Sequence, residues 1–245
     1  MKASQIILIA LIICSGCSKK PDYVIPQNAT VQNGNGSTTT TPTTSRSITY
    51  LALGDSYTIG QSVQPVDSYP NQLTSLLTVK SYNVQPPEII AGTGWTTADL
   101  ISIIANSDVV GKKFDFVTLL IGVNDEFQKK SQSTYRTQFA QVLNTAINFA
   151  NGDSSKVFVL SIPDWGVTPF ANGMDNVVGP LIDQFNAINK DESNKRGVNY
   201  LDITDISREA TTDPSLIAVD GLHPSAKMYG KWMQRLEPLV EKKLK

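Results

Sequence analysis

Residues 48–245 of this 245-residue chain alternate between short apolar segments and segments with apolar residues at helical spacing, and this alternation limits the possible folds. Strands are predicted at residues 48–53, 88–91, 114–121, 157–162 and 198–203. The third segment is almost continuously apolar, as in a strand covered on both faces. Strands that alternate with helices form a parallel sheet between helical layers. The sequence therefore predicts an α/β fold, a three-layer α/β/α sandwich whose parallel sheet has about five strands.

Four polar clusters stand where such a sheet gathers functional residues, at the carboxyl ends of strands and before the last helix. They are Gly-Asp-Ser-Tyr-Thr at 54–58, Gly-Thr-Gly-Trp at 92–95, Gly-Val-Asn-Asp at 122–125 and Asp-Gly-Leu-His-Pro at 220–224. Taken singly, each cluster also fits an ordinary turn or the start of a helix. Their order along the chain and their common position at strand ends indicate one site.

The first and last clusters hold the residue types of a nucleophilic triad. A serine needs a base within hydrogen-bond reach, and His223 is the single histidine of the chain. Asp220 precedes it by three residues, so a tight turn can bring the carboxylate to the inner ring nitrogen and select the tautomer. The sequence therefore predicts a triad of Ser56, His223 and Asp220.

The same clusters supply donors for an oxyanion, which ester hydrolysis requires. Asn124 offers a side-chain amide, and Ser56 offers its own backbone N–H at the start of a turn. Gly94 offers a backbone N–H that a ligand can approach closely, because glycine has no Cβ. The neighbouring carboxylates of Asp55 and Asp125 are expected to brace their turns rather than to catalyse.

Together the four clusters resemble the four signature blocks of the SGNH hydrolases, also called the GDSL esterase/lipase superfamily. The resemblance covers residues 48–245 and implies a flavodoxin-like sandwich that hydrolyses esters through a serine without a metal. In the second block, Gly94 matches because it precedes Trp95 in a Gly-Trp-Thr-Thr stretch, and Gly92 is the alternative match. The residues matched to the family's site are Ser56, Gly94, Asn124, Asp220 and His223.

The expected substrate is a small-molecule or carbohydrate ester with a short acyl group, such as an acetyl ester, because the chain shows no long apolar lid. A lysophospholipase or thioesterase is the alternative activity, and a non-catalytic surface binding protein on the same fold is the alternative class. Trp95 and Trp165, the latter in a loop after the fourth predicted strand, are candidate substrate contacts. Each of them also fits simple packing against its own loop.

Charge and composition exclude other classes. The chain has 21 Lys and Arg against 22 Asp and Glu, a net charge of −1, so it lacks the basic surplus of a nucleic-acid binder. With one His, and both Cys within the first 17 residues, the body cannot hold a thiolate zinc site or a multi-histidine centre. No metal and no cofactor are therefore expected.

The first residues have the layout of a bacterial export signal. Lys2 precedes an apolar run at 6–13, and small residues follow. The run is less than half of the roughly 20 residues that a membrane-spanning helix needs. Ser15-Gly16-Cys17 resembles the lipoprotein cleavage box, which implies a signal peptide at 1–16 and lipidation of Cys17. Cys14 departs from the Leu usual in that box, and ordinary secretion is the alternative.

Residues 17–47 are expected to form a flexible tether to the domain at 48–245. From residue 27 onward the segment is nearly all Asn, Gly, Gln, Ser and Thr. A tether of about 30 residues has a typical reach of roughly 30 Å, which would hold a domain just off a membrane surface. We expect the protein in the bacterial cell envelope, anchored by lipid at Cys17. The residue after Cys17 is Ser18 and not the Asp associated with inner-membrane retention, and this favours the outer membrane or cell surface.

Overall fold

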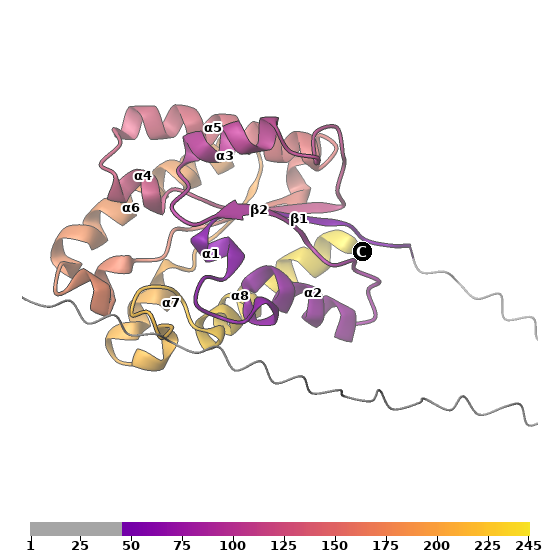
Figure 1. Ribbon diagram of the computed structural model, residues 1–245. Helices are drawn as coiled ribbons and strands as arrows, with labels where there is room; N and C mark the ends of the chain where they lie inside the picture. Colours follow the sequence, from indigo (N-terminus) through magenta and orange to yellow (C-terminus); the bar gives the residue numbers. More distant parts are fainter. Residues whose placement is uncertain (1–45) are drawn as a thin grey trace, which may run out of the picture. The chain divides into compact units, whose positions relative to one another are not determined.

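Five parallel strands form the sheet at the centre of the structure, a computed structural model that describes residues 46–245 (Figure 1). The strands are β1 (Tyr50–Asp55), β2 (Glu88–Gly92), β3 (Phe116–Leu120), β4 (Val157–Leu160) and β5 (Asn199–Leu201). Their order across the sheet is β2-β1-β3-β4-β5, and every neighbouring pair is parallel. The expected signal peptide, Cys17 and most of the expected tether lie outside the described residues.

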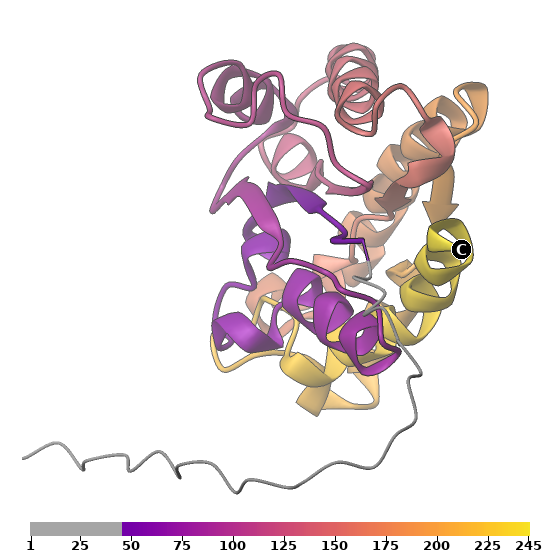
Figure 2. The same cartoon turned by 90° about the vertical axis from the view of Figure 1, so that its right-hand side faces the viewer.

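Helices cover both faces of the sheet, as Figures 1 and 2 show. On one face, α5 (Gln132–Phe149) packs between α3 (Thr97–Ala105) and α6 (Asp175–Lys195). On the other face, α2 (Tyr69–Val79) packs along α8 (Ala226–Leu244). The predicted three-layer α/β/α sandwich is thereby confirmed.

Shorter elements fill the connections. Three are single-turn α-helices, namely α1 (Ser56–Ile59), α4 (Val123–Phe127) and α7 (Thr204–Arg208). The others are 3₁₀ turns at Pro65–Asp67, Ser154–Lys156, Trp165–Val167, Pro169–Ala171, Glu209–Thr211 and Pro214–Leu216. Among the described residues, no helix has the length and apolar character required to cross a membrane.

The central strands explain the continuous apolar segments of the sequence. Every residue of β1, β3 and β4 is buried, because helices lie against both faces, whereas the edge strands β2 and β5 are partly exposed. Tyr50 of β1 stacks on Phe116 of β3 with ring centroids 4.3 Å apart. From α8, the fully buried Trp232 packs against Tyr69 and Tyr229 and closes the core on that side.

Strand register brings three of the polar clusters to the same edge. Asp55 at the end of β1 pairs with Gly92 at the end of β2, and Gly54 pairs with Leu120 at the end of β3. The loops that follow these three strands therefore start side by side. β1 runs two residues beyond its predicted end, so that α1 begins directly at Ser56.

Candidate active site

Ser56 is the first residue of α1 and stands on a tight strand-to-helix turn. Asp55 caps this helix, since its Oδ1 accepts a hydrogen bond from the backbone N–H of Tyr57 at 3.0 Å. At Gly54 a Cβ would overlap the carbonyl oxygen of Leu120 and the hydroxyl of Thr58, so only glycine fits. Ser56 is 5% exposed. The turn thus holds the serine in a fixed place at the carboxyl end of β1.

His223 is oriented by Asp220 through the turn that precedes α8. Asp220 Oδ1 accepts from the backbone N–H groups of Leu222 and His223, each at 3.0 Å, and its Oδ2 lies 2.6 Å from His223 Nδ1. An ionised carboxylate can only accept, so Nδ1 carries the hydrogen and Nε2 is left as the basic nitrogen. The ring is 6% exposed and meets Tyr57 edge-on at 5.7 Å.

Asp220 has one partner that the sequence motifs do not contain. The hydroxyl of Ser62, in the loop after α1, donates to Asp220 Oδ2 at 2.6 Å. Partial burial would raise the pKa of Asp220, but the hydrogen bonds from Ser62, the Leu222 and His223 amides and the imidazole hold this pKa well below its usual range. Asp220 therefore stays ionised at neutral and mildly acidic pH, and it can stabilise an imidazolium.

Asn124 and Gly94 present the donors expected for an oxyanion. Asn124, in the first turn of α4, donates one Nδ2 hydrogen to the carbonyl of Trp95 at 3.0 Å, which leaves the second hydrogen of the amide. Gly94 has φ of +78°, and nothing lies within 4 Å of the place a Cβ would occupy. Space is therefore open on the side of Gly94 where a side chain would lie.

The two neighbouring aspartates brace the site, as expected. Asp125 accepts from the backbone N–H and the hydroxyl of Thr97, at 2.9 and 2.7 Å, and so ties α4 to the start of α3. Burial raises the pKa of Asp55 to about 8, against the hydrogen bond from Tyr57 N–H, and the charge of Asp125 adds to the rise. Among the described residues, Asp55 Oδ2 has no hydrogen-bond partner. Asp55 thus caps α1 mainly as a neutral carboxylic acid near pH 7.

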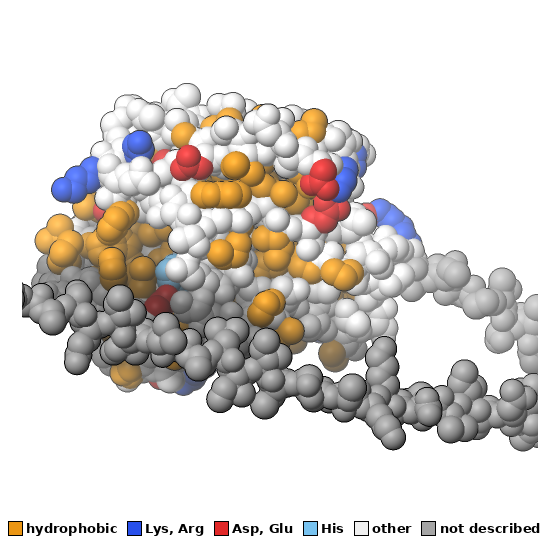
Figure 3. Space-filling view, in the orientation of Figure 1, with side chains coloured by type: hydrophobic (Ala, Val, Ile, Leu, Met, Phe, Trp, Pro, Cys, Tyr) orange, Lys and Arg blue, Asp and Glu red, His pale blue; other side chains and the backbone are white. Residues whose placement is uncertain are grey.

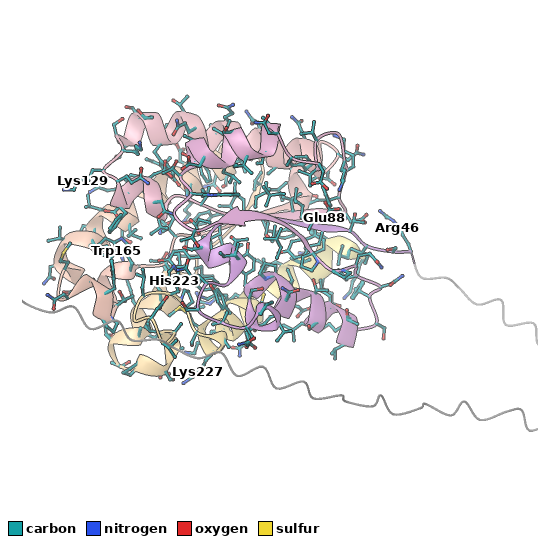
Figure 4. All side chains as sticks on the ribbon, viewed as in Figure 1. Arg46, Glu88, Lys129, Trp165, His223 and Lys227 are labelled. Atoms are coloured by element: carbon teal, nitrogen blue, oxygen red, sulfur yellow. The ribbon has the colours of Figure 1, made fainter. Side chains whose placement is uncertain are left out.

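One cavity of about 230 Å³ joins these groups, since Ser56, Gly94, Asn124 and His223 all line it. Aromatic side chains form much of the remaining wall, namely Tyr57, Phe127, Trp165 and Phe170. In Figure 3 the imidazole is visible beside a group of hydrophobic side chains, and Figure 4 shows His223 and Trp165 on the same side of the molecule. Among residues 46–245, no three His, Cys, Asp or Glu side chains cluster as ligands for a metal ion.

The two candidate tryptophans have different surroundings. Trp165 lines the cavity, is 6% exposed and donates from Nε1 to Glu126 Oε2 at 2.9 Å. Trp95 does not line the cavity, because its indole packs directly against Gly92, and only its neighbours Thr93 and Gly94 reach the cavity wall. The expected substrate contact thus has a structural basis for Trp165, whereas Trp95 has the packing role.

Comparisons with known proteins bear on the family and on the fold. The sequence model of the GDSL-like lipase/acylhydrolase family matches residues 52–231. No curated protein matches the chain. Three similar solved structures are TesA, the psychrotrophic esterase EstA from Pseudoalteromonas sp. and a variant of an acetyl xylan esterase from Geobacillus stearothermophilus.

These likenesses extend over nearly the whole of the other chains. TesA has 15% identity and a TM-score of 0.64, and the match covers 80% of this chain and 99% of TesA. EstA has 15% identity and a TM-score of 0.61, with 80% and 98% covered. The acetyl xylan esterase has 17% identity and a TM-score of 0.57, with 79% and 94% covered. At such identities the structures show a shared fold.

The family match includes the blocks that carry Ser56, Gly94, Asn124, Asp220 and His223. The resemblance to the SGNH hydrolases that these blocks indicated is confirmed, together with the fold it implied. Because the match extends over residues 52–231, the chain belongs to the GDSL-like lipase/acylhydrolase family and is an ester-hydrolysing enzyme.

Proposed function

We propose that the protein hydrolyses carboxylic esters with short acyl groups through a triad of Ser56, His223 and Asp220. One observation carries this proposal: the imidazole is held through Nδ1 by Asp220, and it lines the same cavity as Ser56 and the donors Gly94 and Asn124. An oriented base, a serine and open N–H donors around one small space are the parts that acyl transfer needs.

In the first half of the reaction, Ser56 Oγ attacks the ester carbonyl carbon while His223 Nε2 takes the hydroxyl proton. The carbonyl oxygen becomes an oxyanion, which accepts from the backbone N–H groups of Ser56 and Gly94 and from the free amide hydrogen of Asn124. Asp220 stabilises the imidazolium. The imidazolium then gives its proton to the leaving alcohol oxygen as the ester bond breaks, and an acyl-serine remains.

Water completes the cycle by the same route. His223 takes a proton from the water, the resulting hydroxide equivalent attacks the acyl-serine, and a second oxyanion forms at the same donors. Collapse of this intermediate returns the proton to Ser56 Oγ and releases the carboxylic acid. No other group is required for this cycle.

The size of the catalytic cavity supports a short acyl group. Its volume of about 230 Å³ lies below the roughly 300–1,000 Å³ of pockets that bury drug-sized ligands. Phe127, Trp165 and Phe170 form its aromatic wall. Acetyl or butyryl esters of sugars or small alcohols would fit beside Ser56, whereas lysophospholipids and fatty-acyl thioesters would need more room.

A panel of p-nitrophenyl esters from acetate to decanoate, run beside acetylated sugars, tests the proposal. We expect the highest kcat/KM at the shortest acyl groups. Ser56→Ala is the matched control and should lower kcat by about 10⁴-fold or more while the protein stays folded. A preference for decanoate would support the lysophospholipase or thioesterase alternative. A folded protein that hydrolyses none of these esters would be better explained as a binding protein.

We also propose that the enzyme acts at the bacterial cell envelope, held by a lipid on Cys17. The support is the sequence alone, namely the export signal at 1–16, the cleavage box and the polar tether at 17–47. Such a tether would let the site reach ester substrates near the membrane surface.

A further inference from the structure

A second, larger cavity lies next to the catalytic cavity. Its volume is about 640 Å³, and it shares two lining residues with the catalytic cavity, Phe127 and Trp165. Its apolar wall comes from Met174 and from Val177, Leu181 and Phe185 of α6. Nothing in the proposed reaction uses this space, although two of its lining residues also line the catalytic cavity.

Phe127 stands between the two cavities. It is the last residue of α4, three residues after Asn124, so the two side chains lie on the same side of that helix. Its ring meets Trp165 edge-on with centroids 5.4 Å apart. Trp165 is buried and held by Glu126, whereas Phe127 is 53% exposed. The partly exposed Phe127 ring therefore lies against the buried Trp165, and removing the Phe127 ring would leave Trp165 in place.

We propose that Phe127 sets the upper limit of acyl length by closing the catalytic cavity off from the second cavity. Without the ring, an acyl chain attached to Ser56 would extend over Trp165 into the second cavity. This inference rests on the proposed function, because it assumes that the catalytic cavity binds an ester.

The chemistry of the second cavity and the direction of the reaction both favour the acyl chain as the occupant. Met174, Val177 and Leu181 are partly exposed and offer a surface that matches hydrocarbon. The rest of the lining includes polar and charged residues, namely Glu126, Lys129, Lys130, Ser131 and Gln132. The leaving oxygen must face His223 to receive its proton, so of the two chains of the ester the acyl chain is the one that extends away from His223, toward Phe127 and Trp165. A hydrocarbon chain would then cover apolar surface that is otherwise wet.

The first test is the variant Phe127→Ala, assayed with p-nitrophenyl butyrate and decanoate. Each methylene that becomes buried is worth about a factor of four in affinity, so two or three of them in the second cavity should raise the decanoate-to-butyrate ratio of kcat/KM about tenfold or more. Because Phe127 is half-exposed, its truncation leaves the core intact, and thermal unfolding checks this. An unchanged ratio in the folded variant would overturn the proposal.

Phe170→Ala is the matched control. Phe170 is also 53% exposed and lines the catalytic cavity, but it does not line the second cavity. The Phe170 ring packs against Phe127 and Trp165, with centroids 6.4 and 6.1 Å away, but both of those rings remain in the variant. The wall between the cavities therefore stays, and the ratio should change less than about threefold, short of one buried methylene. An equal gain in Phe170→Ala would show that mere enlargement explains the effect, and the barrier role of Phe127 would be wrong.

A double variant locates the acyl chain. Leu181, on α6, lines only the second cavity, so Leu181→Trp added to Phe127→Ala should place an indole in the path of the acyl chain and reduce the gain with decanoate. A double variant that keeps the gain would overturn the proposed path. Decyl acetate, which carries its long chain on the alcohol, should show no gain in Phe127→Ala. A gain with that ester in place of decanoate would assign the second cavity to the alcohol.

The wild-type enzyme separates this inference from the proposed function. If it hydrolyses no ester, the proposed function fails. If it hydrolyses butyrate and Phe127→Ala leaves the ratio unchanged, only the inference fails. A wild type that hydrolyses decanoate as fast as butyrate would show that Phe127 is no barrier.

Discussion

Replacing Asn124 by alanine removes one of the proposed oxyanion donors and leaves the proposed nucleophile, Ser56, and the proposed base, His223, in place. One hydrogen of the Asn124 amide is used by the carbonyl of Trp95 at 3.0 Å, so a single N–H remains for the reaction. The loss of one such donor costs about 10²–10³ in kcat, or roughly 3–4 kcal/mol of transition-state stabilisation. KM should change only a few-fold, because the planar ester needs this donor less than the oxyanion does.

Asn124→Asp sharpens the same test. The aspartate has nearly the same size, but its carboxylate has no hydrogen to donate and carries a charge toward the developing oxyanion. Its kcat should therefore fall further than that of Asn124→Ala. Both variants lose the bond to the Trp95 carbonyl, which contributes about 1 kcal/mol, so the melting temperature should fall by only about 2–4 °C.

The assay is steady-state hydrolysis of p-nitrophenyl butyrate, with kcat and KM determined separately. Thr93→Ala is the control, because the Thr93 hydroxyl lines the same cavity but donates to Gln61 Oε1 at 2.7 Å. Its kcat should stay near that of the wild type. A normal kcat in Asn124→Ala, or a rise in KM alone, would refute the oxyanion assignment and make Asn124 a ground-state binding residue.

Four further predictions concern other parts of the molecule. As pH drops, kcat/KM should fall as expected for the binding of one proton, because His223 must be neutral to act as base. Full activity at about pH 4.5 would contradict this. In Ser62→Ala this fall in kcat/KM should occur at higher pH, because Asp220 Oδ2 then bonds the imidazolium more strongly. A fall at the same pH as in the wild type would show that the Ser62–Asp220 hydrogen bond does not influence His223. Between pH 3.8 and about 8 the folded protein holds the Asp55 proton more tightly than the unfolded chain does. The free energy of unfolding should therefore decline as pH rises, by up to about 1.4 kcal/mol per pH unit. Asp55→Asn should lack this decline in urea unfolding, and parallel declines in both proteins would count against a neutral Asp55. Cys17→Ser should release the protein from the membrane fraction with kcat unchanged, and a variant that resists washing would point to the apolar run as the anchor.

The order of elements and the main residues of the candidate site could be predicted because both depend on local patterns. The pair of Asp220 and His223 is an example, since these residues lie three positions apart and bond across one turn. Strand ends were less predictable, since residues 54 and 55 have the composition of a turn. They join β1 because backbone pairing with β2 continues through both of them and pairing with β3 continues through Gly54, and this pairing leaves no mark on side-chain type.

The residues that the sequence could not indicate act through distant contacts. Ser62 lies 158 positions from Asp220 and belongs to no motif, so only the folded chain shows their hydrogen bond. Phe127 follows the third cluster, but its place between two cavities depends on Trp165 from another loop. The same holds for the tryptophans, which were equal candidates in the sequence until packing placed one on Gly92 and the other in the cavity wall.

The two bonds that join α4 to the loop after β2 have a consequence for how the site responds to its substrate. Asn124 holds the Trp95 carbonyl, and Asp125 holds Thr97, so the segment from Trp95 to Thr97 is fastened at both ends to neighbouring residues of one helix. The Gly94 amide lies one residue before that segment, so both proposed oxyanion donors belong to, or adjoin, one hydrogen-bonded unit. Donors fixed in advance need no reorganisation as negative charge builds, so the barrier contains little cost for moving dipoles into place.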